Sequence, residues 1–135
     1  MWYMKTDTSY ESMRVYRLAI EIAEQENADM LIVQLAALLH DVDDVKLSPE
    51  THEAKKNAVG FMKNNGVDEK VIASVCKIID EVSFAGTDSV VPSTLEGKCV
   101  QDADRLDAIG AIGIARTFTY GCSKGRRIHD PDIKP

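Results

Sequence analysis

Cysteine, histidine and aromatic residues are scarce in this chain of 135 residues. The three cysteines (Cys76, Cys99 and Cys122) lie far apart and show none of the Cys-x-x-Cys spacing that zinc and redox sites use. We therefore expect reduced, structural thiols rather than a disulfide framework.

Long apolar runs and an excess of positive charge are also missing. No stretch approaches the roughly 18 apolar residues of a membrane span, and the first residues do not resemble a signal peptide. We therefore expect a cytoplasmic protein without a membrane-spanning segment. The formal net charge of −6 argues against long nucleic acid as a partner, because basic residues supply most non-specific affinity. The net charge does not exclude a small phosphorylated partner, since a metal ion or a local cation cluster can hold phosphate in an acidic protein.

Helical spacing of apolar residues runs through most of the chain and predicts an all-α fold. Asp29 is placed to cap one helix, and Gly66 to end another. The segment Ser83–Thr94 is typical of a loop, and Gly110 and Gly113 are expected to permit close helix contact inside a continuous helix. The predicted helices span Ser12–Glu26, Met30–Leu39, Ser48–Asn65, Asp68–Val82 and Leu95–Phe118.

The domain prediction is one unit, residues 1–135, built as a bundle of about five or more helices. After Tyr120 the sequence becomes polar and irregular, without a helix to close the bundle. We therefore expect a domain that is shortened at its C-terminus, and a naturally loose tail is the alternative interpretation.

The first candidate for chemistry is the pair His40 and Asp41, at the polar end of the apolar segment Met30–Leu39. A charged pair is costly in such a place unless it is paired or binds an ion. Imidazole nitrogen and carboxylate oxygen together suit manganese, iron, cobalt, nickel or zinc. The dipeptide alone is weak evidence, because a histidine near a helix C-terminus is often only a favourable partner of the helix dipole.

The second candidate is a cluster of three carboxylates, Asp102, Asp104 and Asp107, beside Arg105. On a helix Asp104 and Asp107 share a face, because residues three apart are neighbours. A solvated first helical turn is the competing interpretation. The apolar residues on both sides of the cluster favour a position near the interior, where carboxylates need a cation, either Arg105 or a metal ion.

Three segments of the sequence, Ala36–Asp41, Val82–Phe84 and Gln101–Arg116, together resemble the HD-domain superfamily of metal-dependent phosphohydrolases. The resemblance is strongest to the small stand-alone bacterial members, and the third segment is its most specific part. It implies a helical core in which histidine and aspartate side chains hold one or two divalent ions.

The same resemblance implies the ligands. His40 and Asp41 match the pair that gives the superfamily its name, and Asp104 matches a distant aspartate, with Asp102 as the alternative. The sequence departs from the pattern at the first ligand, where Glu11 replaces a histidine. Glu11 could bind through its carboxylate, which would favour manganese or magnesium, or the replacement could disable the site.

The resemblance also implies roles for four charged residues, each of which could instead be an ordinary surface charge. Asp44 would orient or deprotonate the attacking water, Lys46 and Arg14 would neutralise phosphate oxygens, and Arg105 would pair with a carboxylate or with substrate. The predicted function is a metal-dependent phosphohydrolase that acts on a nucleotide or another small phosphate ester, with Mn, Fe, Co, Ni, Zn or Mg as cofactor. The alternatives are a catalytically impaired module that binds metal or nucleotide, and a purely structural bundle. The oligomeric state is left open.

Overall fold

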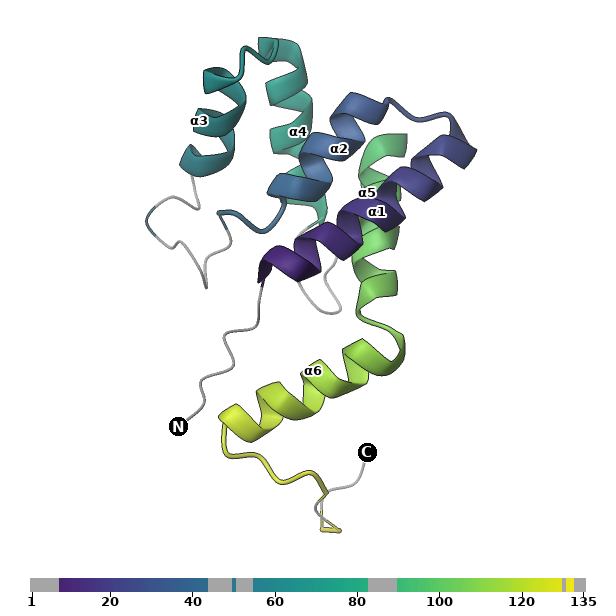
Figure 1. Ribbon diagram of the computed structural model, residues 1–135, viewed down its shortest axis with the longest axis vertical. Coiled ribbons are helices and arrows are strands. Elements are labelled where there is room, and N and C mark those ends of the chain that lie inside the picture. Colours follow the sequence, from purple (N-terminus) through teal and green to yellow (C-terminus); the bar gives the residue numbers. More distant parts are fainter. Residues whose placement is uncertain (1–7, 44–49, 51–54, 83–89, 130, 133–135) are drawn as a thin grey trace.

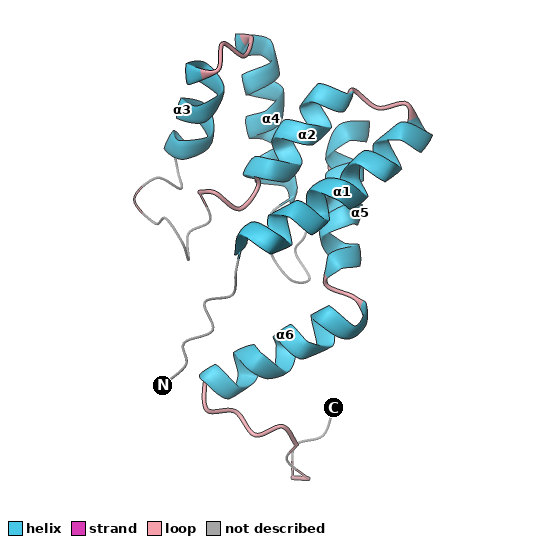
Figure 2. Cartoon of the chain, in the orientation of Figure 1, coloured by secondary structure: helices cyan, strands magenta, loops and turns pink. Residues whose placement is uncertain are grey.

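Helices account for all the regular secondary structure in the described residues, which are 8–43, 50, 55–82, 90–129 and 131–132 of the computed structural model (Figures 1 and 2). This confirms the all-α prediction. Within these ranges, no helix is long and apolar enough to cross a membrane. The helices are α1 (Thr8–Glu26), α2 (Met30–Leu39), α3 (Lys56–Asn64), α4 (Glu69–Val82), α5 (Leu95–Asp107) and α6 (Gly110–Ser123).

Helix α2 crosses the core, as its composition predicts, and packs against α1, α4 and α5 (Figure 1). Asp29 caps it, because Oδ1 of Asp29 accepts hydrogen bonds from the backbone N–H groups of Leu31 and Ile32, at 3.0 and 3.3 Å. The backbone N–H of Asp29 in turn donates to Glu96 on α5, at 3.0 Å. These contacts fix the start of α2 against α5 and so set where its other end, at His40, lies.

Helix α3 begins at Lys56 and not at Ser48 as the sequence predicted. Lys55 adopts a left-handed backbone conformation, with φ of 46°, so a regular helix cannot run through it. The Lys55 side chain does not cap α3. Buried Asp43, in the turn that follows α2, caps it instead. Its carboxylate accepts hydrogen bonds from the backbone N–H groups of Asn57 and Ala58, at 3.3 and 2.9 Å. The predicted start signal, residues 48–49, lies outside the described residues.

The predicted helix Leu95–Phe118 is two helices, α5 and α6, and the prediction of one continuous helix was wrong. Ile109 is extended and Gly110 has φ of 83°, a left-handed conformation that glycine adopts without strain. A Cβ at Gly113 would lie 2.0 Å from the carbonyl oxygen of Ala108. The two glycines therefore break the helix and let α6 start close against the end of α5.

Helix α6 lies apart from the other five in Figure 1, and α5 is its main packing partner. Gly113 is its only buried residue. Large apolar side chains on α6 are exposed, including Ile112, Ile114, Phe118 and Tyr120. Side-chain contacts bring together the start of α1, the residues just after α2, the end of α5 and the middle of α6, and the candidate site lies there.

Candidate active site

His40 is the first residue beyond α2, and only 8% of it is exposed. Its Nδ1 lies 2.8 Å from the carbonyl oxygen of Ala37. In the neutral imidazole the proton on Nδ1 is donated to this carbonyl, so Nε2 carries the free electron pair. An imidazole fixed in this way by a backbone carbonyl is the usual arrangement of a metal-binding histidine.

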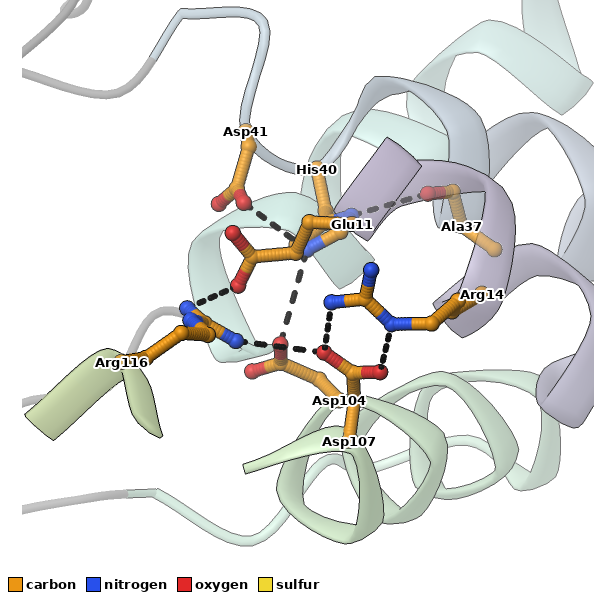
Figure 3. Close-up of polar contacts among 8 residues, drawn as sticks. All are labelled: Glu11, Arg14, Ala37, His40, Asp41, Asp104, Asp107 and Arg116. Carbon is orange, nitrogen blue, oxygen red and sulfur yellow. Dashed lines mark hydrogen bonds and ion pairs between the residues drawn. The ribbon is translucent and has the colours of Figure 1, made fainter. Parts of the chain in front are cut away.

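Two carboxylates face Nε2 of His40 from different parts of the chain (Figure 3). Oδ2 of Asp41 lies 3.2 Å away and Oδ1 of Asp104, on α5, lies 3.7 Å away. Nε2 is a buried polar atom without a hydrogen-bond partner among the described residues. Asp102, the alternative to Asp104, is exposed on another face of α5.

The surroundings of His40 attract positive charge. Burial by itself lowers the pKa of His40, but contacts with Asp104 and Asp41 and the negative charge of Asp41 outweigh it and raise the pKa to about 10. The imidazole is therefore protonated at neutral pH when no other cation is near. In this state it stabilises the folded chain, and the stabilisation is lost as the pH rises from the ordinary histidine range toward 10.

Asp107 lies one turn after Asp104 on α5 and joins two arginines (Figure 3). Arg14 of α1 binds it in a fork, with Nε 2.7 Å from Oδ1 and Nη2 3.0 Å from Oδ2. Arg116 of α6 donates from Nη1 to Oδ2 at 3.1 Å. Only 5% of the Asp107 side chain is exposed, so this carboxylate is neutralised inside the fold.

Glu11 of α1, which the sequence resemblance predicts as a metal ligand in place of a histidine, pairs with Nη2 of Arg116. Burial raises the pKa of Glu11, Arg116 lowers it, and the negative charges of Asp41 and Asp107 raise it again, so that the net pKa lies above the ordinary value. Four carboxylates thus come together near His40: Glu11 and Asp107 pair with arginines, whereas Asp41 and Asp104 face the imidazole.

The donor types at this site fit a divalent ion, because a fixed imidazole nitrogen with an unsatisfied Nε2 faces carboxylate oxygens. In the part of the chain that the structure describes, no group of three or more His, Cys, Asp or Glu side chains is already arranged to hold one. The fit therefore lies in the chemistry of His40, Asp41 and Asp104 and in the orphaned nitrogen, and not in a finished coordination shell.

The structure places the other predicted site residues in different environments. Arg105 is exposed on α5 and forms no ion pair with the described residues, so it is not the cation of the buried carboxylate. Arg14 and Arg116 fill that role, and sequence reasoning did not assign it to either of them. The i+3 spacing of Asp104 and Asp107 was the available signal for a shared face. Asp44 and Lys46 lie outside the described residues.

The sequence model of the HD domain matches residues 8–109, which include Glu11, His40, Asp41 and Asp104. The chain belongs to the HD-domain family. The prediction made from the three sequence segments is thereby confirmed. Solved structures that are similar to this chain include an HD-superfamily hydrolase.

Relatives of this HD-domain chain come from several bacteria. The protein YpgQ of Bacillus subtilis is 42% identical over 118 residues, which cover 86% of this chain and 58% of YpgQ. A crystal structure of YpgQ in complex with ADP has a TM-score of 0.76 at 42% identity, covering 91% of this chain and 61% of that one. An HD-superfamily hydrolase from Bacillus thuringiensis has a TM-score of 0.75 at 43% identity, covering 93% of this chain and 60% of that one. The chain thus spans about three fifths of the length of these relatives.

Proposed function

We propose that this HD-domain chain is a metal-dependent phosphohydrolase acting on a nucleotide or another small phosphate ester. The observation that carries the proposal is the buried, unsatisfied Nε2 of His40, which faces the carboxylates of Asp41 and Asp104. The similarity to an HD-superfamily hydrolase supports the reaction class. The ADP complex of YpgQ supports a nucleotide as the ligand.

His40, Asp41 and Asp104 would hold the divalent ion, with Nε2 of His40 presented by the contact of Nδ1 with Ala37. The chemistry that such an ion supplies is polarisation of a phosphoryl oxygen and acidification of a water molecule. Glu11 would add a further carboxylate oxygen on the side of Asp41, which favours manganese or magnesium over softer ions.

The arginines would act on the substrate and not on the ion. Arg105 is exposed and unpaired among the described residues, so its guanidinium group can reach a phosphate from solvent. Arg14 uses Nε and Nη2 to bind Asp107, which leaves Nη1 for a phosphate oxygen and fixes the group in one orientation. Asp44 would orient or deprotonate the attacking water, and Lys46 would offset the charge that develops on phosphate oxygens.

A binding module without turnover is the second candidate, and the pairing of Glu11 with Arg116 favours it. A carboxylate already neutralised by an arginine is a weaker metal ligand than a free one. Such a module would bind metal and nucleotide through the same side chains and would release no product.

The test is metal content by elemental analysis on the purified chain, beside thermal-shift titrations with manganese, nickel and magnesium. Asp104→Ala removes a proposed ligand, and Asp102→Ala is the matched control on the same helix. We expect Asp104→Ala to weaken metal binding at least about tenfold and Asp102→Ala to leave it unchanged. Equal binding in the two variants would contradict the assignment of Asp104.

A second measurement separates the two candidates. The metal-loaded chain is incubated with nucleoside di- and triphosphates, and phosphate or pyrophosphate release is followed together with the melting temperature. Product release that Asp104→Ala abolishes supports the enzyme. Thermal stabilisation by a nucleotide with no product over hours supports the binding module.

A further inference from the structure

Helix α6 is joined to the rest of the described fold through one polar side chain, that of Arg116. Its guanidinium group binds Glu11 of α1 and Asp107 of α5. The other side-chain hydrogen bonds of α6 in the described chain run within the helix, from Thr117 to Gly113, from Thr119 to Ala115 and from Ser123 to Tyr120. Its apolar side chains are largely exposed. The position of α6 therefore depends strongly on Arg116.

The contacts of Arg116 also lie next to the candidate metal ligands, His40, Asp41 and Asp104 (Figure 3). Charges alternate along one connected path from Arg14 to Asp107, then to Arg116 and Glu11. Beyond Glu11 come Asp41 and His40, and the negative charge of Asp41 acts on Glu11. Glu11 thus takes part both in the ion pair that holds α6 and in the group of candidate metal ligands.

We propose that the ion pairs of Arg116 form a latch in which the guanidinium group and a divalent ion compete for Glu11. This proposal rests on the function proposed above, because it takes Glu11 to be a ligand of the same ion. When Arg116 holds Glu11, this ion pair ties α6 to α1, and we call this the docked state. When the ion draws Glu11 toward Asp41, Arg116 keeps only its single hydrogen bond to Asp107, and α6 is loosened.

Electrostatics gives the direction of this coupling. A divalent ion beside Glu11 places like charges close to the Arg116 guanidinium group, and their repulsion opposes docking. Asp107 does not restore the pair, because Arg14 already binds both of its oxygens. Linkage is reciprocal: if the ion loosens α6 by a given factor, loosening α6 strengthens binding of the ion by the same factor.

The experiment uses the full chain, manganese chloride as the probe, calorimetry for manganese affinity, and hydrogen exchange of α6 amides read by mass spectrometry. The variants are Arg116→Gln, Glu11→Gln and Lys124→Gln. The last is the matched control: it removes the same charge from the exposed region just after α6, where the Lys124 side chain lies over the Tyr120 ring. Arg116→Lys, which keeps the charge but loses the fork, is added in case Arg116→Gln folds poorly.

We expect manganese to speed exchange in α6 of the wild type and of Lys124→Gln while α2 and α4 stay protected. Arg116→Gln should show fast α6 exchange without metal and bind manganese roughly tenfold more tightly, with Arg116→Lys between it and the wild type. Glu11→Gln should speed exchange of the α6 amides without metal, and manganese should then cause no further change in that exchange.

Three other outcomes separate the latch from the function on which it rests. If the wild type binds manganese while α6 exchange is unchanged or slower and Arg116→Gln has the same affinity, the latch is overturned and the metal site stands. If only Arg116→Gln binds manganese, the latch is supported and the wild type is held in the docked state. If neither binds manganese, both the metal site and the latch are rejected.

Discussion

Helices α2 and α6 are both rich in apolar residues, yet one crosses the core and the other lies largely in solvent. α2 buries Val33, Ala36, Ala37 and Leu39 between three neighbouring helices. α6 buries only Gly113. Composition therefore indicates that a segment forms a helix with apolar side chains, but the connections at its ends decide whether those side chains reach a core. α2 is fixed by the Asp29 cap, whereas α6 leaves α5 at a sharp turn around Gly110.

The same contrast separates the two sides of the candidate site. α2 presents His40 from a buried helix end with its ring oriented by Ala37, which suits a fixed ligand. α6 presents Arg116 from an exposed helix through ion pairs, which suits a contact that opens and closes. A rigid ligand and an adjustable counter-charge thus meet at the carboxylates of α1 and α5.

The largest expected difference between the two helices is in their tolerance of charge. Val33 in α2 is fully buried and Ile114 in α6 is 59% exposed. Val33→Asp should lower the free energy of unfolding by about 4 kcal/mol or more, because the carboxylate would be buried without a partner. Ile114→Asp should change it by less than about 0.5 kcal/mol. Urea denaturation followed by circular dichroism measures both, and similar losses would show that α6 is as buried as α2.

A smaller effect is expected where α6 is attached. Asp107→Asn keeps the shape of the buried side chain but removes the charge that Arg14 and Arg116 share. We expect the free energy of unfolding to fall by about 2 kcal/mol. This is less than the full cost of breaking a buried ion pair, because both arginines are about one-third exposed and can be hydrated. Asp102→Asn on the exposed face of α5 is the control, with a change within about 0.5 kcal/mol. If only Asp102→Asn lowered the free energy of unfolding, Asp102 and not Asp107 would be the carboxylate that holds the fold together.

The smallest effects concern glycines. Gly110 at the turn before α6 has φ of 83°, and Gly60 lies inside α3 with nothing within 4 Å of an added Cβ. Gly110→Ala should lower the free energy of unfolding by about 1 kcal/mol, because a side chain disfavours the left-handed conformation. Gly60→Ala should stabilise by about 0.5 kcal/mol or more, because alanine has less conformational freedom to lose. Thermal unfolding should show a lower melting temperature for Gly110→Ala and a higher one for Gly60→Ala. If both variants melted at lower temperature, Gly60 would not lie in an open helical site.

Much of the helical layout was predictable because it depends on short-range interactions. Apolar spacing gave α1, α2 and α4 with small errors at their ends, and Asp29 and Gly66 act at the helix ends where they were expected. The start of α3 was missed because its cap comes from Asp43, which lies 15 residues before Ala58 in the chain. The split of α5 from α6 was missed because a helical apolar pattern continues through Ile109 and Gly110.

The sequence by itself determined the all-α class, the family, and the residue types that meet at His40, because local periodicity and a few short motifs carry them. Only the tertiary structure decided which cation neutralises which carboxylate. Arg14 and Asp107 are 93 residues apart in the chain, and Arg116 reaches Glu11 from a helix whose direction depends on one turn. Ion pairs between distant segments depend on how helices pack, and no local pattern of residues specifies that.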